Sequence, residues 1–418
     1  MIENDVWTIL GSGDRKALGP YLDDLTIRVQ TVAKGTYDEL IVTVDELSDS
    51  NLLLFEFGLY DEAIRITDLM AICVETATHH PDESERTKCA SAKLLTNQAR
   101  IGMRIGARWN SIRRMSEGIK EFQYIDGAED CVFWMSEYLE WQKNIVLWKP
   151  PIGRTRPNLT RPALIFSNAF AIDTFPNKNS TEFIAPESPS AFLDKIGESD
   201  VSQMIATRLL NTEVIAGIAE VVHRIEIVNE LLINFPNCLN LLTTKVALKS
   251  IYWRILAKNL HVRSLDFLQD CVEEYRLISE TFPRDSYLKF NYYGELAELI
   301  NFQFQIGNSV VAGEIAENGL IEIRSITKEV GDNDPHWTSF ESLYCWYVSV
   351  ALYNSSEFDR SAELMLKARN LAREVLLIDK SDVAALHVNY LSYFRLFVVF
   401  RRAVHRSVFR VIRFRGRS

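Results

Sequence analysis

The sequence lacks the features that most easily identify exported, membrane-spanning and zinc-binding proteins. Its six cysteines are scattered, with no CxxC pair and no spacing typical of zinc ligands. The first residues are acidic and do not resemble a secretory signal. No apolar run approaches the roughly 20 residues that span a bilayer. We therefore expect a soluble cytoplasmic or nuclear protein that has reduced thiols and no membrane span.

Motifs for cofactor binding and catalysis are also missing. Residues 10–16 are rich in glycine but fit neither GxGxxG nor GxxxxGK[ST], the patterns that bind phosphates. The seven histidines form no HExxH pair, and no GxSxG nucleophile motif occurs. The sequence therefore predicts a protein that is not an enzyme and that binds no cofactor and no metal. An unrecognised enzyme remains a minor alternative.

Charge is distributed unevenly along the chain. Hydrophobic residues make up 47% and charged residues 24%, as in ordinary folded proteins. The net charge is −10, yet residues 401–418 contain seven arginines and no acid, so the other 400 residues carry −17. Such an acidic body repels nucleic-acid phosphate, and nucleic-acid contact is expected only through the tail. The tail arginines are Arg401, Arg402, Arg406, Arg410, Arg413, Arg415 and Arg417.

A short segment recurs about every 48 residues. It first occurs as FGLYDEAI at residues 57–64, and the turn residue recurs in steps of 48, 105, 48, 48 and 49. Five positions after each turn residue is an Ala or a Ser, which lets two helices cross closely. The turn residues are Gly58, Gly106, Asn211, Asn259, Gly307 and Ser356, and the small residues are Ala63, Ser111, Ala216, Ser264, Ala312 and Ser361. The pattern predicts antiparallel helix pairs.

The Gly-x-Tyr-x-x-Ala turn resembles that of tetratricopeptide repeats. The resemblance covers residues of about 50–80, 90–125 and 200–380. It implies an all-α fold, a right-handed α-solenoid of antiparallel helix pairs. The family unit is usually about 34 residues, so the helices here are longer, and other helical-hairpin repeats remain open. Prolines that follow the turns by 23 to 28 residues are expected to end the second helices: Pro81, Pro236, Pro283 and Pro335.

The pattern divides the chain into four parts. We expect N-terminal helical repeats at 1–148 and C-terminal helical repeats at 190–395. Seven of the twelve prolines fall between them, which predicts an irregular insertion at 149–189. The last part is a basic aromatic tail at 396–418. Its role is left open between a capping helix, membrane-surface docking, nucleic-acid binding and nuclear import.

The tetratricopeptide resemblance also implies a binding groove. In such arrays the first helix of each pair lines the concave face, where extended peptides bind. The matching positions are Asn97, Arg100, Met103, Arg104, Arg208, Asn301, Phe304, Gln305, Tyr353 and Asn354. Three arginines among them favour a partner segment that carries an acid or a free C-terminus.

We therefore expect a non-enzymatic protein-interaction scaffold that binds a protein or peptide partner along the concave face. The alternative is a regulatory or nucleic-acid-associated helical repeat protein that is targeted through its arginine-rich tail.

Overall fold

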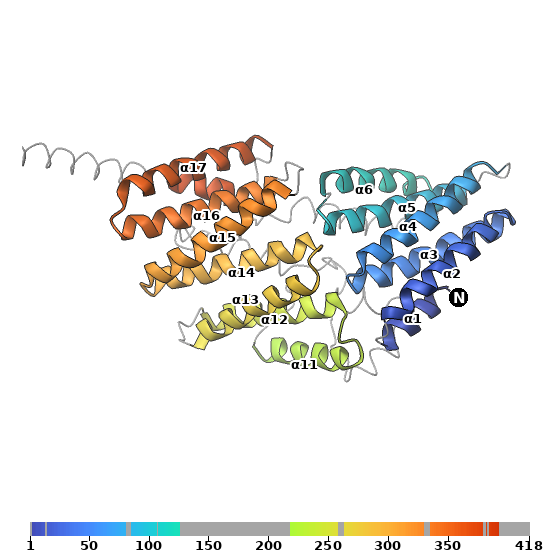
Figure 1. Cartoon of the computed structure of the whole chain (residues 1–418), viewed down its shortest axis with the longest axis horizontal. Helices are drawn as coiled ribbons and strands as arrows, with labels where there is room; N and C mark the ends of the chain where they lie inside the picture. The colour runs from blue at the N-terminus through green and yellow to red at the C-terminus, as the bar shows by residue number, and fades with distance from the viewer. Residues whose placement is uncertain are drawn as a thin grey trace, which may run out of the picture. The chain divides into compact units, whose positions relative to one another are not determined.

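The computed structural model describes residues 2–12, 15–80, 85–106, 108–125, 218–257, 263–329, 335–378, 382 and 384–392. These residues form helices and short connections, with no strand among them. Helices that follow one another in the sequence pack as antiparallel neighbours, for example α5 with α6 and α16 with α17 (Figure 1). The all-α fold of stacked helix pairs is confirmed. The insertion at 149–189 and the tail at 396–418 lie outside the described residues.

The chain divides into two compact units. Unit 1 contains α1 to α6, α11, α12 and residues 274–289, and unit 2 contains residues 263–273, 290–305 and α15 to α17. Both α11 and α12 group with the N-terminal helices rather than with the later helix pairs. The boundary falls within the sequence of α13 and again within α14.

The first helices of the chain are α1 (Ile2–Ser12), the 3-10 helix η1 (Arg15–Ala17), α2 (Leu18–Val32), α3 (Tyr37–Glu56), α4 (Tyr60–Thr78), α5 (Glu85–Arg104) and α6 (Arg108–Phe122). The later helices are α11 (Ile218–Asn234), α12 (Leu239–Ala257), α13 (Arg263–Thr281), α14 (Ser286–Gln305), α15 (Ser309–Glu329), α16 (Pro335–Asn354) and α17 (Phe358–Ile378). Residues 384–392 are also helical.

The predicted hairpin turns are confirmed wherever the structure describes them. Gly58, Gly106, Gly307 and Ser356 have φ values of 71°, 98°, 88° and 68°. In every case the first helix ends two residues earlier and the second begins two residues later. Positive φ is the left-handed conformation that glycine adopts most easily and that commonly ends helices. The turns predicted at Asn211 and Asn259 lie outside the described residues.

The prolines mark the connections between helix pairs. Pro236 lies between α11 and α12, and Pro283 lies between α13 and α14. Pro335 is the first residue of α16 rather than a residue that ends α15. Proline suits this position because the first helical N–H has no partner within the helix. Pro81 lies outside the described residues.

The small residues after the turns are buried where the two helices of a pair cross. Ala63, Ala312 and Ser361 have no exposed surface, and Ser111 is 2% exposed. The Nδ2 of Asn51 donates to the carbonyl oxygen of Ala63 at 2.6 Å. The Ser361 hydroxyl donates at 2.7 Å to the carbonyl oxygen of Ser349, twelve positions earlier. Because these side chains are fully or almost fully buried, a longer side chain would have to displace its neighbours.

Replacing Ala63 or Ala312 with Leu is therefore expected to destabilise the unit that contains it by about 1–3 kcal/mol, because the crossing becomes overpacked. Urea unfolding followed peptide by peptide with hydrogen exchange would measure the loss in each unit. Ile27→Leu, at a position that is 64% exposed, serves as the control. Unchanged stability of both the Ala63→Leu and the Ala312→Leu variant would contradict the assigned helix crossings.

The interior of unit 2 is rich in aromatic side chains. Phe290 stacks on Trp337 with ring centroids 4.2 Å apart, and Phe340 adds a further stacked ring. Tyr344 donates its hydroxyl hydrogen to the carbonyl oxygen of Tyr293 at 2.8 Å. Apart from the half-buried Thr338, α16 is buried on all sides from its first residue to position 351, as expected of a central helix with mostly apolar faces.

Candidate partner-binding surface

Two of the predicted groove positions, Arg100 and Arg104, are basic residues of α5. Arg86 pairs with Asp38 at 2.6 Å and Lys93 pairs with Asp45 at 2.7 Å. Each pair joins residues 48 positions apart, so equivalent positions of neighbouring helix pairs face each other across α3 and α5. Arg100 comes next in this seven-residue series and is half-buried. Among the described residues, no carboxylate lies within ion-pair distance of Arg100.

Four predicted groove residues lie in the interior of the fold. Asn97 is 3%, Met103 5%, Arg104 8% and Asn301 6% exposed. Asn97 donates to the hydroxyl of Ser48 at 2.9 Å, across the contact between α3 and α5. The prediction that these four side chains line an accessible groove is therefore wrong.

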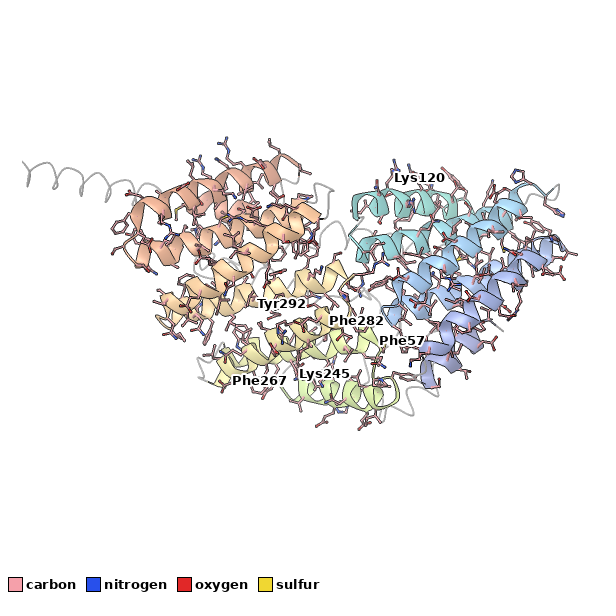
Figure 2. The ribbon with its side chains drawn as sticks, in the orientation of Figure 1. Phe57, Lys120, Lys245, Phe267, Phe282 and Tyr292 are labelled. Atoms are coloured by element: carbon pink, nitrogen blue, oxygen red, sulfur yellow. The ribbon has the colours of Figure 1, made fainter. Side chains whose placement is uncertain are left out.

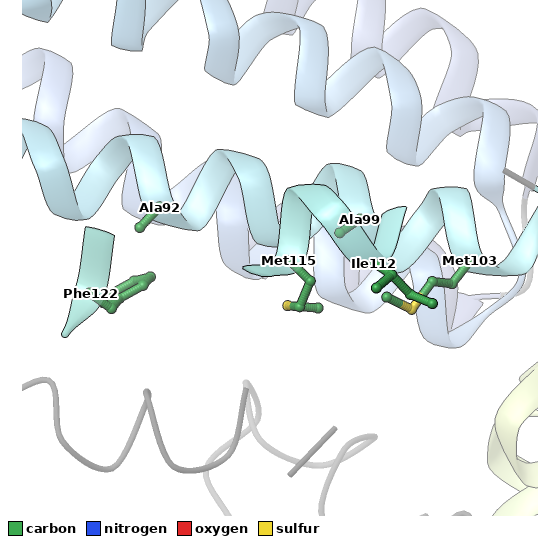
Figure 3. Close-up of a cluster of buried hydrophobic side chains, with 6 residues drawn as sticks. All are labelled: Ala92, Ala99, Met103, Ile112, Met115 and Phe122. Carbon is green, nitrogen blue, oxygen red and sulfur yellow. The ribbon is translucent and has the colours of Figure 1, made fainter. Parts of the chain in front are cut away.

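Met103 belongs to a hydrophobic cluster between α5 and α6. Figure 3 shows its side chain beside that of Ile112, and both are buried. The cluster consists of Ala92, Ala99, Met103, Ile112, Met115 and Phe122. Its role in unit 1 is to hold the two helices together, because burial of apolar side chains stabilises the fold by about 25 cal/mol per Å² of surface removed from water.

Arg104 is held in a buried polar cluster centred on Asp285, a residue with no exposed surface. The Arg104 Nε lies 3.6 Å from an oxygen of the Asp285 carboxylate, and the Tyr60 hydroxyl donates to the same carboxylate. The other carboxylate oxygen accepts from the backbone N–H of Leu288 at 2.9 Å and so caps α14. The Ser286 hydroxyl donates to the carbonyl oxygen of Arg104 at 2.7 Å.

The Asp285 cluster explains why Arg104, one of the three arginines of the predicted basic patch, is not at the surface. Burial, together with the neighbouring Asp285 carboxylate, raises the pKa of the Tyr60 phenol well above its usual range, so this phenol stays a hydrogen-bond donor. Arg104 lies over the ring of Phe55, 5.5 Å from its centroid. Its charge is thus satisfied inside unit 1, where an acidic peptide does not reach it. Arg208 and the tail arginines lie outside the described residues.

A second set of contacts joins the α3–α4 turn to the α12 start. Asn240 donates to the carboxylate of Glu56, and the Cys238 thiol donates to the carbonyl oxygen of Glu56 at 3.7 Å. Figure 2 labels Phe57 and Phe282, which lie near this turn in unit 1. Both phenylalanines are buried. Cys238, Asn240 and Phe282, which lie far along the sequence, thus cover the turn between α3 and α4.

In unit 2 the structure brings four predicted groove residues to one end of the helix pairs. Gln305 and Asn354 are exposed, and Phe304 and Tyr353 are half-buried. The Asn354 Nδ2 donates to the Ser309 hydroxyl at 2.9 Å, which joins the two hairpin turns. We call residues 304–311 and 353–357 the turn-end surface.

Exposed aliphatic side chains extend the turn-end surface. Ile306 is 49%, Val310 69% and Val311 41% exposed. Farther along α15, Ile321 is 61% exposed. Single exposed apolar residues are common on protein surfaces, but a group of them beside amide side chains is typical of an interaction site.

Asp285, Val310 and Ile321 are not among the residues predicted from the sequence. Asp285 lies two residues after Pro283 and directly precedes α14, a position at a helix start that indicates a capping residue. Its contact with Arg104 has no local signal, because the two residues are far apart in the sequence. Val310 and Ile321 fit the spacing of one helix face, but spacing alone does not distinguish an exposed face from a buried one.

No described helix is both long and apolar enough to cross a membrane. Among the residues that the structure describes, no group of three or more His, Cys, Asp or Glu side chains is arranged to hold a metal ion.

Comparisons with known proteins add little to this description. No family model matches the chain, and no curated protein matches it. A solved structure described as a circular tandem repeat protein with novel repeat topology and enhanced subunit contact surfaces is similar over 97% of both chains, at 12% sequence identity and a TM-score of 0.23. A TM-score this low supports no conclusion about architecture or activity. The chain's own helix pairs, with their regular turns, identify it as a helical repeat protein.

Proposed function

We propose that the chain is a non-enzymatic scaffold of the tetratricopeptide-like kind, and that it binds a protein partner at the turn-end surface of unit 2. The observation that carries the proposal is the grouping of Phe304, Gln305, Tyr353 and Asn354 beside exposed aliphatic residues. Aromatic and amide side chains combine apolar contact area with hydrogen-bonding groups, which suits them to protein interfaces. The partner is expected in the cytoplasm or nucleus.

The groove differs in position from that of the tetratricopeptide resemblance. Unit 1 uses the equivalent positions for its own packing, as the burial of Arg104 illustrates. The longer helix pairs therefore leave the hairpin ends of unit 2, rather than one continuous concave face, as the candidate surface.

A quantitative pull-down tests the proposal. The full chain is compared with an Ile306→Asp/Val310→Asp variant, which places two charges on the turn-end surface. We expect the partner proteins recovered with the full chain to fall by about tenfold or more, because a buried unpaired charge is costly at an interface. An Ile27→Asp variant, altered at a position that is 64% exposed in unit 1, should recover the partners unchanged.

Equal recovery by all three proteins would contradict the proposed surface. A third variant distinguishes the proposed scaffold function from the alternative, in which the chain is targeted through its tail. When the seven tail arginines are changed to Gln, a scaffold keeps its partners, whereas tail-directed binding is lost and depends steeply on salt in the unaltered chain.

A further inference from the structure

The exposed face of α15 carries a stripe of two acidic residues with an aliphatic residue at each end. Val310, Glu314, Glu317 and Ile321 follow the spacing i, i+4, i+7 and i+11 and are all exposed. With 3.6 residues per turn, these four positions lie within an arc of about 60° and span about 16 Å of helix. We call these residues the α15 stripe: two carboxylates between two aliphatic side chains.

The two carboxylates of the α15 stripe lie apart from the cations that the structure describes. Among the described residues, no Lys or Arg lies within ion-pair distance of Glu314 or Glu317. The nearby Arg324 is directed to α16 instead, where its Nε lies 3.1 Å from the carboxylate of Glu341. Glu322, on a neighbouring face, accepts a hydrogen bond from Tyr293 at 3.0 Å.

This arrangement costs stability in the free protein. Like charges three residues apart on a helix repel each other by a few tenths of a kcal/mol, and aliphatic side chains at both ends remain in water. The fold does not need either feature, because the opposite face of α15 makes the packing contacts through Ala312, Ala316 and Leu320. A bound segment that places cations on the carboxylates and apolar groups on the aliphatic residues would remove both costs.

We infer that the partner segment recognised by unit 2 is a basic amphipathic helix that lies along the α15 stripe. This rests on the proposed function and deepens it by naming the chemistry of the partner. The inference reverses the charge expected from the sequence, because Arg104 is used inside unit 1 while the carboxylates of Glu314 and Glu317 face solvent. A complementary helix presents apolar, basic, basic and apolar residues at i, i+4, i+7 and i+11.

The α15 stripe begins within the turn-end surface, because Val310 belongs to both. Ser309 is the first residue of α15, one position before Val310. A helix that lies along the stripe therefore reaches the turn-end surface, where Gln305 and Asn354 can contact the end of its backbone. Helix ends carry backbone groups without internal partners, and amide side chains can both donate to and accept from them.

Binding of a designed probe peptide to the full chain tests the inference. The probe is a helical peptide with Leu, Arg, Arg and Leu at i, i+4, i+7 and i+11 on an alanine–glutamine background. Its affinity is measured by calorimetry at low ionic strength, where charge complementarity is least screened. We expect saturable binding with one site per chain, and a loss of about tenfold or more for the Glu314→Lys/Glu317→Lys variant.

Two matched controls separate a specific site from general acidity. Glu363→Lys/Glu374→Lys makes the same change in net charge at exposed positions of α17 and should leave the affinity unchanged. A peptide with Glu in place of both Arg residues should bind the Glu314→Lys/Glu317→Lys variant but not the unaltered chain. Circular dichroism of each variant checks that the helices remain folded.

Absence of probe binding, or equal weakening by the α15 and α17 variants, would overturn the inference. Either result leaves the proposed function standing if the Ile306→Asp/Val310→Asp variant still loses its partners. Conversely, the probe could bind at the α15 stripe while the Ile306→Asp/Val310→Asp variant recovers its partners unchanged. That result would contradict the proposed function but keep the α15 stripe as a binding surface.

Discussion

Replacing Asp285 with Ala is expected to lower the free energy of unfolding of unit 1 by about 3–5 kcal/mol, because one partner of a buried ion pair is left without compensation. The carboxylate has no exposed surface, and three groups depend on it. The Arg104 guanidinium loses its counterion, the Tyr60 hydroxyl loses its acceptor, and α14 loses the cap on the backbone N–H of Leu288. Urea unfolding at neutral pH measures the effect.

The Asp61–Arg284 pair provides a control within unit 1. Its side chains are 66% and 51% exposed, and exposed ion pairs contribute about 0–1 kcal/mol. Asp61→Ala should therefore change stability far less than Asp285→Ala. Asp285→Asn, which keeps an oxygen for the cap but removes the charge, is expected to fall between the two. Equal effects of Asp285→Ala and Asp61→Ala would show that the buried cluster does not hold unit 1 together.

The fold could be predicted from the sequence where local chemistry decides it. The left-handed turn requires Gly or another residue that tolerates positive φ, and close crossing requires a small residue five positions later. Both requirements act within one helix pair. Gly58, Gly106, Gly307 and Ser356 therefore marked the turns correctly.

The groove could not be predicted in the same way, because long-range packing decides which helix faces remain exposed. Arg104 and Gln305 occupy equivalent positions, two residues before a turn, yet Arg104 is 8% exposed and Gln305 is exposed. The difference arises from Asp285, which lies far along the chain from Arg104. Periodicity within one helix contains no information about such a partner.

The groove positions at the ends of α14 and α16 came from the tetratricopeptide resemblance, applied to the repeat register. Phe304 and Tyr353 stand three residues before their turns, and each packs an aromatic ring within unit 2: Phe304 on Tyr347 and Tyr353 on Phe358. These contacts leave both side chains half-buried. They support the turn-end surface rather than project freely from it, and their substitution would change both packing and binding.

Gly58 and Gly307 share a turn conformation but differ in their surroundings. Gly58 has φ +71°, and an added Cβ would lie 2.7 Å from Leu239 Cδ2 and 2.8 Å from Phe282 Cδ1. Gly307 has φ +88°, and an added Cβ would meet nothing within 4 Å. Leu239 and Phe282 are buried, so neither side chain can move aside at low cost.

Gly58→Ala is therefore expected to destabilise unit 1 by about 2–5 kcal/mol, as backbone strain and overpacking add together. Gly307→Ala should cost unit 2 only about 1–2 kcal/mol, from the backbone term alone. Hydrogen exchange during urea unfolding assigns each loss to its unit through peptides from α4 and α15. Since the backbone term is common to both variants, the difference between them measures how tightly residues 239 and 282 close over the α3–α4 turn. Equal losses would show that the turn conformation alone requires glycine at position 58, and that the contacts from the later part of unit 1 are looser than the structure describes.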